Sequence, residues 1–324
     1  MEVAEGIHRI EGRFAGRYLF QHVLVGERVL LVDTGVVSTP EELIFPYLES
    51  IGRGASEVDY VLCTHPDTDH FGGNGVVRRH APASRVLGHE LDVHWLEDAN
   101  AMVAERYDCF RDDHGIGDSR EDLDTAIALC GDPVPVDVAL RGGEWVTLSD
   151  TWRVEVMHTP GHSEGHLSVW DPRSATLVIA DAAMGRALPY VDGSPALAAT
   201  YTHPTPYAET GERLREREPD LLLTAHFPEM RGEAIQEFLD DSRSLVTDID
   251  SVLVESVEAE PRGLKELVDV VDERLGPLPA ETKNTWAFPI AGHMDELVAA
   301  GRVSAVRRDG RVVWSTGQGR LHAA

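Results

Sequence analysis

The most constraining feature of this sequence is segment 64–73, which reads Thr-His-Pro-Asp-Thr-Asp-His-Phe-Gly-Gly. It places two histidines and two aspartates between His65 and His70, directly after an apolar strand predicted over 58–63. Imidazole nitrogens and carboxylate oxygens suit Zn²⁺, Fe²⁺ or Mn²⁺. Without a cation, four such groups would repel one another or lose hydration. Histidines and aspartates also occur in ordinary loops, so the rest of the chain must decide between these interpretations.

The same arrangement recurs at three later points, where an apolar strand ends on a side chain that can bind a metal. These strands are predicted over 152–157, 176–180 and 220–225. The side chains that follow them are His162, Asp181 and His226. Strand ends at one edge of a sheet can converge on a single point. Four such ends in order are hard to explain as surface residues, so we expect them to surround a common site.

These motifs, in this order, resemble the metallo-β-lactamase superfamily. Its loop pattern, His-x-His-x-Asp-His, is matched by His65, Asp69 and His70. Residues 159–166, Thr-Pro-Gly-His-Ser-Glu-Gly-His, match its later histidine motif. The family's bridging aspartate, last histidine and structural aspartate are matched by Asp181, His226 and Asp33. The resemblance covers roughly residues 5–240 and implies an α/β fold, a four-layer αββα sandwich.

The resemblance also implies two metal positions. The first position would be formed by His65, Asp67 and His162. The second would be formed by Asp69, His70, Asp181 and His226, with Asp181 bridging the two. This chain departs from the family at Asp67, which stands where a histidine is expected. A carboxylate there leaves three outcomes open: a weaker first position, one that prefers a harder ion, or an empty one. The implied cofactor is Zn²⁺, as one or two ions, with iron or manganese as alternatives.

Neighbouring polar residues are expected to support the site rather than to bind metal. Asp33 should orient the loop through hydrogen bonds, as groups behind metal ligands do. His158 and His166 flank the second motif and should cap or brace it.

Composition limits the partners and the compartment. The 324 residues carry a net charge of −27, with 42% hydrophobic and 26% charged residues, which predicts a folded protein with a sizeable core. Such a negative surface disfavours nucleic acids and anionic membranes as partners. Three cysteines without a paired motif, and an acidic start without an apolar stretch, predict a cytoplasmic location.

Two domains are predicted, a catalytic domain over 1–240 and a smaller one over 241–324. Segment 90–132 is long for a connection, which suggests a lid insertion folded over the site. The smaller domain is predicted to contain helices over 245–257, 263–275 and 288–300 and a hairpin over 302–314. This order resembles a winged helix, as in the endoribonuclease-like (β-lactamase-like protein 2) group of the family. Because Asp295 and Glu296 make the third helix acidic, packing or a homodimer interface is favoured over nucleic-acid binding.

The predicted function is a metal-dependent hydrolase that directs a metal-activated water at a small ester, lactone or thioester. Asp69, a ligand beside that water, is the candidate proton acceptor. The pocket walls are expected from 90–132 and 183–206. Candidate contacts are Tyr190, Tyr201 and Tyr207, which can equally be core residues. Two alternatives stay open: a nuclease or phosphodiesterase, suggested by the winged-helix-like segment, and a mononuclear iron dioxygenase of the persulfide type.

Overall fold

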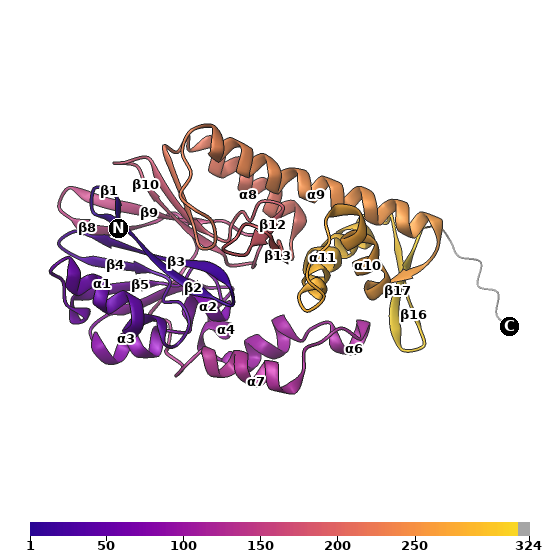
Figure 1. Ribbon diagram of the computed structural model, residues 1–324, viewed down its shortest axis with the longest axis horizontal. Helices are drawn as coiled ribbons and strands as arrows, with labels where there is room; N and C mark the ends of the chain where they lie inside the picture. Colours follow the sequence, from indigo (N-terminus) through magenta and orange to yellow (C-terminus); the bar gives the residue numbers. More distant parts are fainter. Residues whose placement is uncertain (317–324) are drawn as a thin grey trace.

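The computed structural model describes residues 1–316 and has four layers, helix–sheet–sheet–helix, followed by a C-terminal unit (Figure 1). The first sheet has seven strands in sequential order. These are β1 (Glu2–Ala4), β2 (Ile7–Phe14), β3 (Arg17–Val25), β4 (Val29–Val32), β5 (Val58–Leu62), β6 (Arg85–His89) and β7 (Val138–Leu140). Strands β1 to β4 pair antiparallel and β4 to β7 pair parallel. The predicted αββα sandwich is confirmed.

The second sheet has five strands in the order β14-β11-β10-β9-β8. Their bounds are β8 (Glu144–Ser149), β9 (Trp152–His158), β10 (Leu167–Asp171), β11 (Thr176–Ala180) and β14 (Leu221–Thr224). Side chains alternate between the two faces of a strand. In β11, Val178 therefore packs between the sheets, while Leu177 and Ile179 pack under the outer helices. Both faces are buried, which explains why these strands read as continuous apolar runs.

Helices cover the outer face of each sheet. Those beside the first sheet are η1 (Pro40–Ile44), α1 (Phe45–Ser50), η2 (Ala55–Glu57), α2 (Thr68–Phe71) and α3 (Asn74–His80). The second sheet is covered by α8 (Pro204–Glu216) and the first part of α9 (Glu233–Ala259). The short helix α2 begins inside the 64–73 loop, so this loop forms the passage from β5 to the helical layer.

Segment 90–132 folds into five short helices. They are α4 (Val93–Glu97), α5 (Ala99–Met102), η3 (Val103–Tyr107), α6 (Arg111–His114) and α7 (Arg120–Leu129). Met102 and Val103 are buried in the core beneath the first sheet, which anchors the segment. From there α7 and α6 extend toward the C-terminal unit (Figure 1).

Segment 183–206 differs from the loop that its four prolines suggest. It contains an antiparallel hairpin of β12 (Ala187–Pro189) and β13 (Pro195–Ala198). Pro189 ends the first strand and Pro195 begins the second, positions where a missing N–H does not break the ladder. Four prolines favour a loop over a hairpin in this segment. Because Pro189 and Pro195 lie at strand ends, the hairpin forms despite them.

The C-terminal unit packs helices against a three-stranded sheet. After α9 come β15 (Arg262–Gly263), α10 (Leu264–Leu275), η4 (Lys283–Trp286), α11 (Ala287–Ala299), β16 (Ser304–Arg308) and β17 (Arg311–Ser315). The predicted hairpin is confirmed, and its turn is Asp309-Gly310, with both residues at positive φ. The helix predicted over 245–257 is much longer, because Phe238 and Leu239 in its first part pack under the second sheet. The predicted boundary between 240 and 241 therefore falls inside α9.

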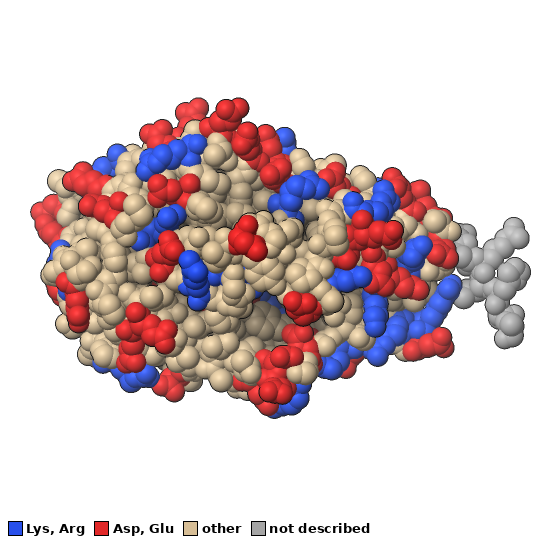
Figure 2. Space-filling view, viewed as in Figure 1, with Lys and Arg blue, Asp and Glu red and all other residues tan. Residues whose placement is uncertain are grey.

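Charge is unevenly spread over the surface. Acidic side chains are scattered across the face shown in Figure 2, while basic ones gather at the end where β16 and β17 lie. No helix within residues 1–316 is both long enough and apolar enough to cross a membrane, and this includes α9 with its 27 residues.

Candidate metal centre

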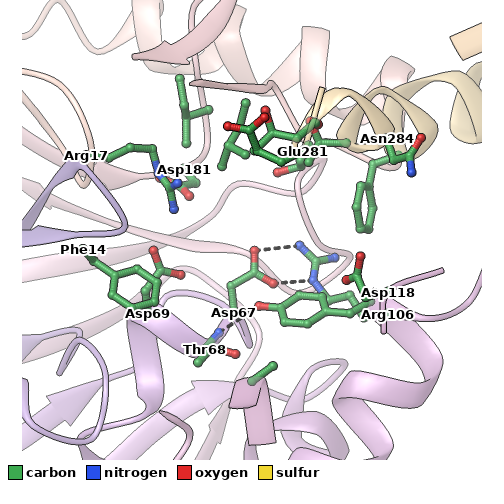
Figure 3. A pocket seen from close by; sticks show the side chains of 18 of the residues that line it. Phe14, Arg17, Asp67, Thr68, Asp69, Arg106, Asp118, Asp181, Glu281 and Asn284 are labelled. Carbon is green, nitrogen blue, oxygen red and sulfur yellow. Dashed lines mark hydrogen bonds and ion pairs between the residues drawn. The ribbon is translucent and has the colours of Figure 1, made fainter. Parts of the chain in front are cut away.

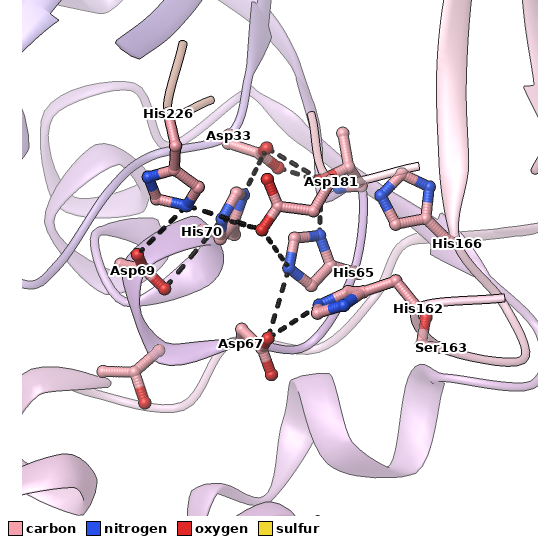
Figure 4. A network of polar contacts seen from close by, with 12 residues as sticks. Asp33, His65, Asp67, Asp69, His70, His162, Ser163, His166, Asp181 and His226 are labelled. Atoms are coloured by element: carbon pink, nitrogen blue, oxygen red, sulfur yellow. Dashed lines mark hydrogen bonds and ion pairs between the residues drawn. The ribbon is translucent and has the colours of Figure 1, made fainter. Parts of the chain in front are cut away.

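The structure brings the seven predicted metal ligands together at one end of the sandwich (Figure 4). They are His65, Asp67, Asp69, His70, His162, Asp181 and His226. The first four follow β5, and the other three follow β9, β11 and β14. Strand ends from both sheets thus converge, as the sequence indicates. The hydrogen bonds and charges around each side chain determine which of them can bind a cation.

Two residues next to the cluster adopt a backbone conformation that non-glycine residues rarely take. Asp33, after β4, has φ of 62°, and Ala180, the last residue of β11, has φ of 42°. Left-handed conformations of this kind persist only where surrounding contacts hold them, and they concentrate at functional sites. The turn at Ala180 directs the next side chain, Asp181, toward the histidines (Figure 4).

Asp33 connects the loop to the ligands. One carboxylate oxygen accepts a hydrogen bond from the backbone N–H of Thr64 at 2.8 Å. The other accepts from the Thr64 hydroxyl and faces Nδ1 of His70, each at 2.8 Å. Because Asp33 is buried, these bonds fix both the loop and the His70 ring. The predicted supporting role of Asp33 is confirmed.

The rings of His70 and His226 are held so that Nε2 faces the centre. Nδ1 of His70 donates to Asp33, and Nδ1 of His226 lies 2.9 Å from the backbone oxygen of Tyr18, to which it donates. In the neutral ring this leaves the Nε2 lone pair available. These Nε2 atoms lie 3.6 and 3.4 Å from the same oxygen of Asp181.

Nε2 of His70 also lacks a hydrogen-bond partner within residues 1–316, although it is buried, and the same is true of Nε2 of His65. Buried polar atoms are nearly always paired in folded proteins. Asp69 completes this side of the cluster, with its oxygens 3.9 Å from Nε2 of His70 and 3.7 Å from Nε2 of His226. Inward-facing lone pairs beside two carboxylates therefore fit a divalent cation at the second position.

Charge coupling is strong at this second position. Burial lowers the pKa of His70, but Asp33, Asp181 and Asp69 outweigh it and raise that pKa well above its usual value. The pKa of His226 is raised in the same way, against burial, chiefly by Asp181. Burial opposes ionisation of Asp181, yet His226 and His70 hold its pKa well below the usual range. The metal-free centre therefore retains protons that a cation must displace.

The first position is occupied differently. The guanidinium of Arg106, from η3, binds the Asp67 carboxylate side-on through one edge, with Nε donating to Oδ1 at 2.5 Å and Nη2 donating to Oδ2 at 3.1 Å. Figure 3 shows this fork as two dashed lines. Arg106 is only 5% exposed. Its charge outweighs the burial of Asp67 and holds the pKa of that carboxyl well below its usual range.

Arg106 also reaches the third member of the first position. Its Nη2 lies 3.0 Å from Nε2 of His162, and its Nη1 donates to the backbone oxygen of His162 at 3.3 Å. Nε2 of His162 is also 2.8 Å from Oδ2 of Asp67. A single ring nitrogen either donates to the carboxylate or accepts from the guanidinium. In both cases its bonding capacity is satisfied by protein groups.

Sequence reasoning missed Arg106. It lies 39 residues after Asp67 in a segment without a recognisable motif. The only available signal was indirect: a carboxylate in place of a histidine adds a negative charge to a buried site, which requires a cation. Segment 90–132 contains three arginines, and the sequence does not distinguish Arg106 from Arg111 and Arg120.

Comparison with known proteins identifies the family. A family model described as the metallo-beta-lactamase superfamily matches residues 18–226, the span from β3 to the last ligand. The chain belongs to the metallo-β-lactamase superfamily. Superfamily membership together with the His/Asp cluster supports a metal-dependent hydrolase in general.

Solved structures of this superfamily show the same fold. A metallo-β-lactamase family protein from Thermus thermophilus is 18% identical, with TM-score 0.75, over 98% of this chain and 100% of its own. A β-lactamase domain protein from Burkholderia ambifaria is 20% identical, with TM-score 0.71, over 97% of this chain and 94% of its own. A subclass B3 metallo-β-lactamase from Bradyrhizobium japonicum, 18% identical with TM-score 0.54, covers 79% of this chain and 93% of its own.

A cavity of about 370 Å³ opens beside the metal centre of this superfamily member. Segment 90–132 contributes Tyr107 and Phe110, and segment 183–206 contributes Leu188 and Leu197, as expected for the walls. The C-terminal unit contributes a third wall through Glu281, Thr282, Asn284, Thr285 and Phe288. This third wall was not predicted from the sequence, because it depends on how the C-terminal unit packs against the catalytic domain.

The three tyrosines proposed as substrate contacts do not line this cavity. Tyr201 and Tyr207 are buried core residues whose rings stack at 4.3 Å. The Tyr201 hydroxyl pairs with His293, and the Tyr207 hydroxyl accepts from the backbone N–H of Met184. Tyr190 packs against Gly16 instead. Their alternative assignment as core residues holds for Tyr201 and Tyr207.

The two histidines that flank the second motif support it. His166 is buried with its ring stacked on His65 at 5.0 Å, and its Nδ1 faces the Thr159 hydroxyl. Nε2 of His158 pairs with the backbone oxygen of Glu164 across the loop. Both predicted supporting roles are confirmed.

Proposed function

We propose that this protein hydrolyses small neutral esters, lactones or thioesters, with a catalytic cation held by Asp69, His70, Asp181 and His226. The cavity beside these ligands carries the proposal. Its lining is largely apolar, with Phe14, Phe110, Ile116, Met184, Leu188, Leu197 and Phe288 among its residues. Small-molecule sites commonly have this character, with a few polar groups at the reacting end.

The charge of the cavity favours a neutral substrate. Five carboxylates line it: Asp67, Asp69, Asp118, Asp181 and Glu281. Two guanidiniums line it as well, and that of Arg106 is already paired with Asp67. Adding one divalent cation leaves about one net negative charge, which would repel a phosphodiester.

Asp69, His70, Asp181 and His226 would hold the divalent cation, which would supply a water of lowered pKa and a Lewis acid for a carbonyl group. The protein's own residues supply orientation and proton transfer. Asp69 lines the cavity as well as the cluster, which supports our proposal that its carboxylate accepts a proton from the attacking water. Tyr107 fixes the start of α2 by accepting a hydrogen bond from the Thr68 N–H at 3.0 Å. The aromatic walls hold the acyl group and exclude bulk water.

The C-terminal contacts support a small molecule over a nucleic acid. Arg307 of the basic hairpin pairs with Asp113, and Arg311 donates to backbone oxygens of α6. Glu296 of the third helix, α11, accepts hydrogen bonds from the backbone and hydroxyl of Thr205. Two arginines of the hairpin and an acidic residue of the third helix are thus engaged within the chain, which favours a packing role for this unit.

The test is a substrate panel on protein loaded with a defined metal. Aryl esters of increasing acyl length, a thioester and a lactone are compared with bis(p-nitrophenyl) phosphate and single-stranded RNA. We expect kcat/KM for the best acyl substrate to exceed that for the phosphodiester by at least about 100-fold. The exposed His80, on α3, provides the matched control, since His80→Ala should leave activity unchanged.

A preference for phosphodiesters or RNA would overturn the proposal in favour of a nuclease. Oxygen consumption by iron-loaded protein with a persulfide, without hydrolysis of any acyl substrate, would overturn it in favour of the dioxygenase.

A further inference from the structure

A single guanidinium contacts the groups that the family resemblance assigns to the first metal. Arg106 binds both oxygens of Asp67 and reaches the ring nitrogen of His162. We propose that Arg106 takes the place of the first cation, so that the centre holds one metal ion rather than two. This inference rests on the proposed cation at the second position, whose ligands Arg106 does not contact within residues 1–316.

Most ligand atoms of the first position already have hydrogen-bond partners in the protein, so few remain to bind a second metal ion. Nε and Nη2 of Arg106 engage the two oxygens of Asp67, and Nη1 donates to the backbone oxygen of His162. Nε2 of His162 is saturated by Arg106 or Asp67. Two buried ring nitrogens of this position lack a partner within residues 1–316, Nε2 of His65 and Nδ1 of His162. Nε2 of His65 lies 3.8 Å from Asp181, and Nδ1 of His162 is not the ring nitrogen that faces Asp67. One imidazole does not make a metal position.

Charge explains why Asp67 and Arg106 belong together. A histidine at position 67 would offer the guanidinium no negative partner, and a buried unpaired arginine is strongly unfavourable. Arginine also stays protonated at all physiological pH values, so it cannot make room by losing its proton. A second cation would have to displace a buried ion pair and meet a fixed positive charge.

Packing holds the guanidinium in place. Arg106 lies in η3 between the buried Val103 and Tyr107, whose hydroxyl is bonded to the α2 backbone. The guanidinium lines the cavity but is held at Asp67 and His162 by its Nε, Nη1 and Nη2 atoms. The first position is therefore blocked by a buried side chain and not by one at the surface.

The experiment counts metal ions directly. Metal-free protein is titrated with Zn²⁺ and the bound ions are counted by elemental analysis after gel filtration, and Mn²⁺-loaded protein is examined by EPR for spin coupling. Wild type should bind one ion per chain and show an uncoupled signal even at tenfold excess metal. Arg106→Ala, and the double variant Asp67→His with Arg106→Ala, should bind two ions and show a coupled pair.

Arg111→Ala is the matched control, because Arg111 belongs to the same segment and pairs with Asp108 away from the histidines. It should bind one ion, as wild type does. Two ions in wild type, or one ion in both Arg106 variants with native circular dichroism, would overturn the inference. If neither variant folds, the wild-type count and its EPR signal decide. Absence of any bound ion in wild type refutes the proposed function instead, so the two failures are distinguishable.

Discussion

The two halves of the centre share one loop, and both contain buried carboxylates whose negative charge must be compensated. They compensate it in different ways. At the second position, Asp69, Asp181 and two histidines with inward-facing lone pairs leave a concentration of negative charge for a cation from solution. At the first position, the carboxylate of Asp67 is neutralised by Arg106 from the chain itself. The difference shows that a ligand motif alone does not define a metal position. The charged side chains that contact the motif in the folded protein must also be known.

The largest expected effect separates the two positions through their histidines. His70→Ala removes a ligand of the second position and should reduce kcat/KM by about 10³-fold or more, with loss of bound metal. His162→Ala alters only a neighbour of Arg106 and should keep metal binding at one ion per chain. Elemental analysis and esterase kinetics measure both. Equal loss of metal in the two variants would break the comparison.

Stability should reveal the fixed charge at the first position. Arg106→Ala leaves Asp67 buried without its partner, so we expect unfolding to become easier by about 3–5 kcal/mol in metal-free protein. The double variant Asp67→Ala with Arg106→Ala should lose less than the sum of the two single changes. Urea unfolding of all four proteins tests this. Simple additivity would show that the pair is not coupled.

Supporting carboxylates should act on their own half of the centre. Asp33→Asn weakens the hydrogen bond that orients His70 and should lower metal affinity about 10–100-fold. Asp92→Asn is the control, because Asp92 accepts from Ser163 and Gly165 in the loop that carries His162. That variant should keep its metal affinity. Competition with a coloured chelator measures the metal affinity of both variants. Equal losses of affinity would contradict the claim that each carboxylate supports only its own half of the centre.

The smallest effect concerns pH in chelator-treated protein. The pKa values of His70 and His226 are raised on folding, so their contribution to stability is complete below about pH 6.5 and fades as pH rises through the raised values. The lowered pKa of Asp181 works in the opposite direction, and its contribution is lost as pH falls through the lowered value.

Urea unfolding from pH 5 to 9 should therefore show metal-free wild type losing stability toward alkaline pH. His70→Ala should show a weaker slope, while His80→Ala should follow wild type. The pair at the first position contributes no such slope at neutral and alkaline pH, because Arg106 does not titrate there. A rise in metal-free stability above pH 7 would contradict this picture.

The convergence of the ligands was predictable from local pattern, whereas the αββα fold was predicted through the family resemblance of the ordered motifs. Apolar strands, each followed by a polar side chain, suffice to predict that His65, His162, Asp181 and His226 meet. The role of Asp33 was implied by the same resemblance, which matches this residue to a structural aspartate of the family. These features need no knowledge of contacts between distant parts of the chain.

Arg106 and the tyrosines were not predictable because they depend on tertiary placement. Nothing local distinguishes an arginine that enters a metal site from one that stays in solvent. The same holds for Tyr201 and Tyr207, whose hydroxyls find partners in the core, and for Phe288, which lies on a helix expected to pack or dimerise but also lines the cavity. Each case is decided by a neighbour far away in sequence.

Helix α9 has a consequence for protein engineering. Its first turns, with Phe238, complete the layer under the second sheet, and its later turns, with Leu245 and Ile249, form the core of the C-terminal unit. A chimaera that exchanges the C-terminal unit with a relative must therefore be spliced before Glu233, at the chain reversal of Gly232. A junction within the helix would join half of one hydrophobic stripe to half of another.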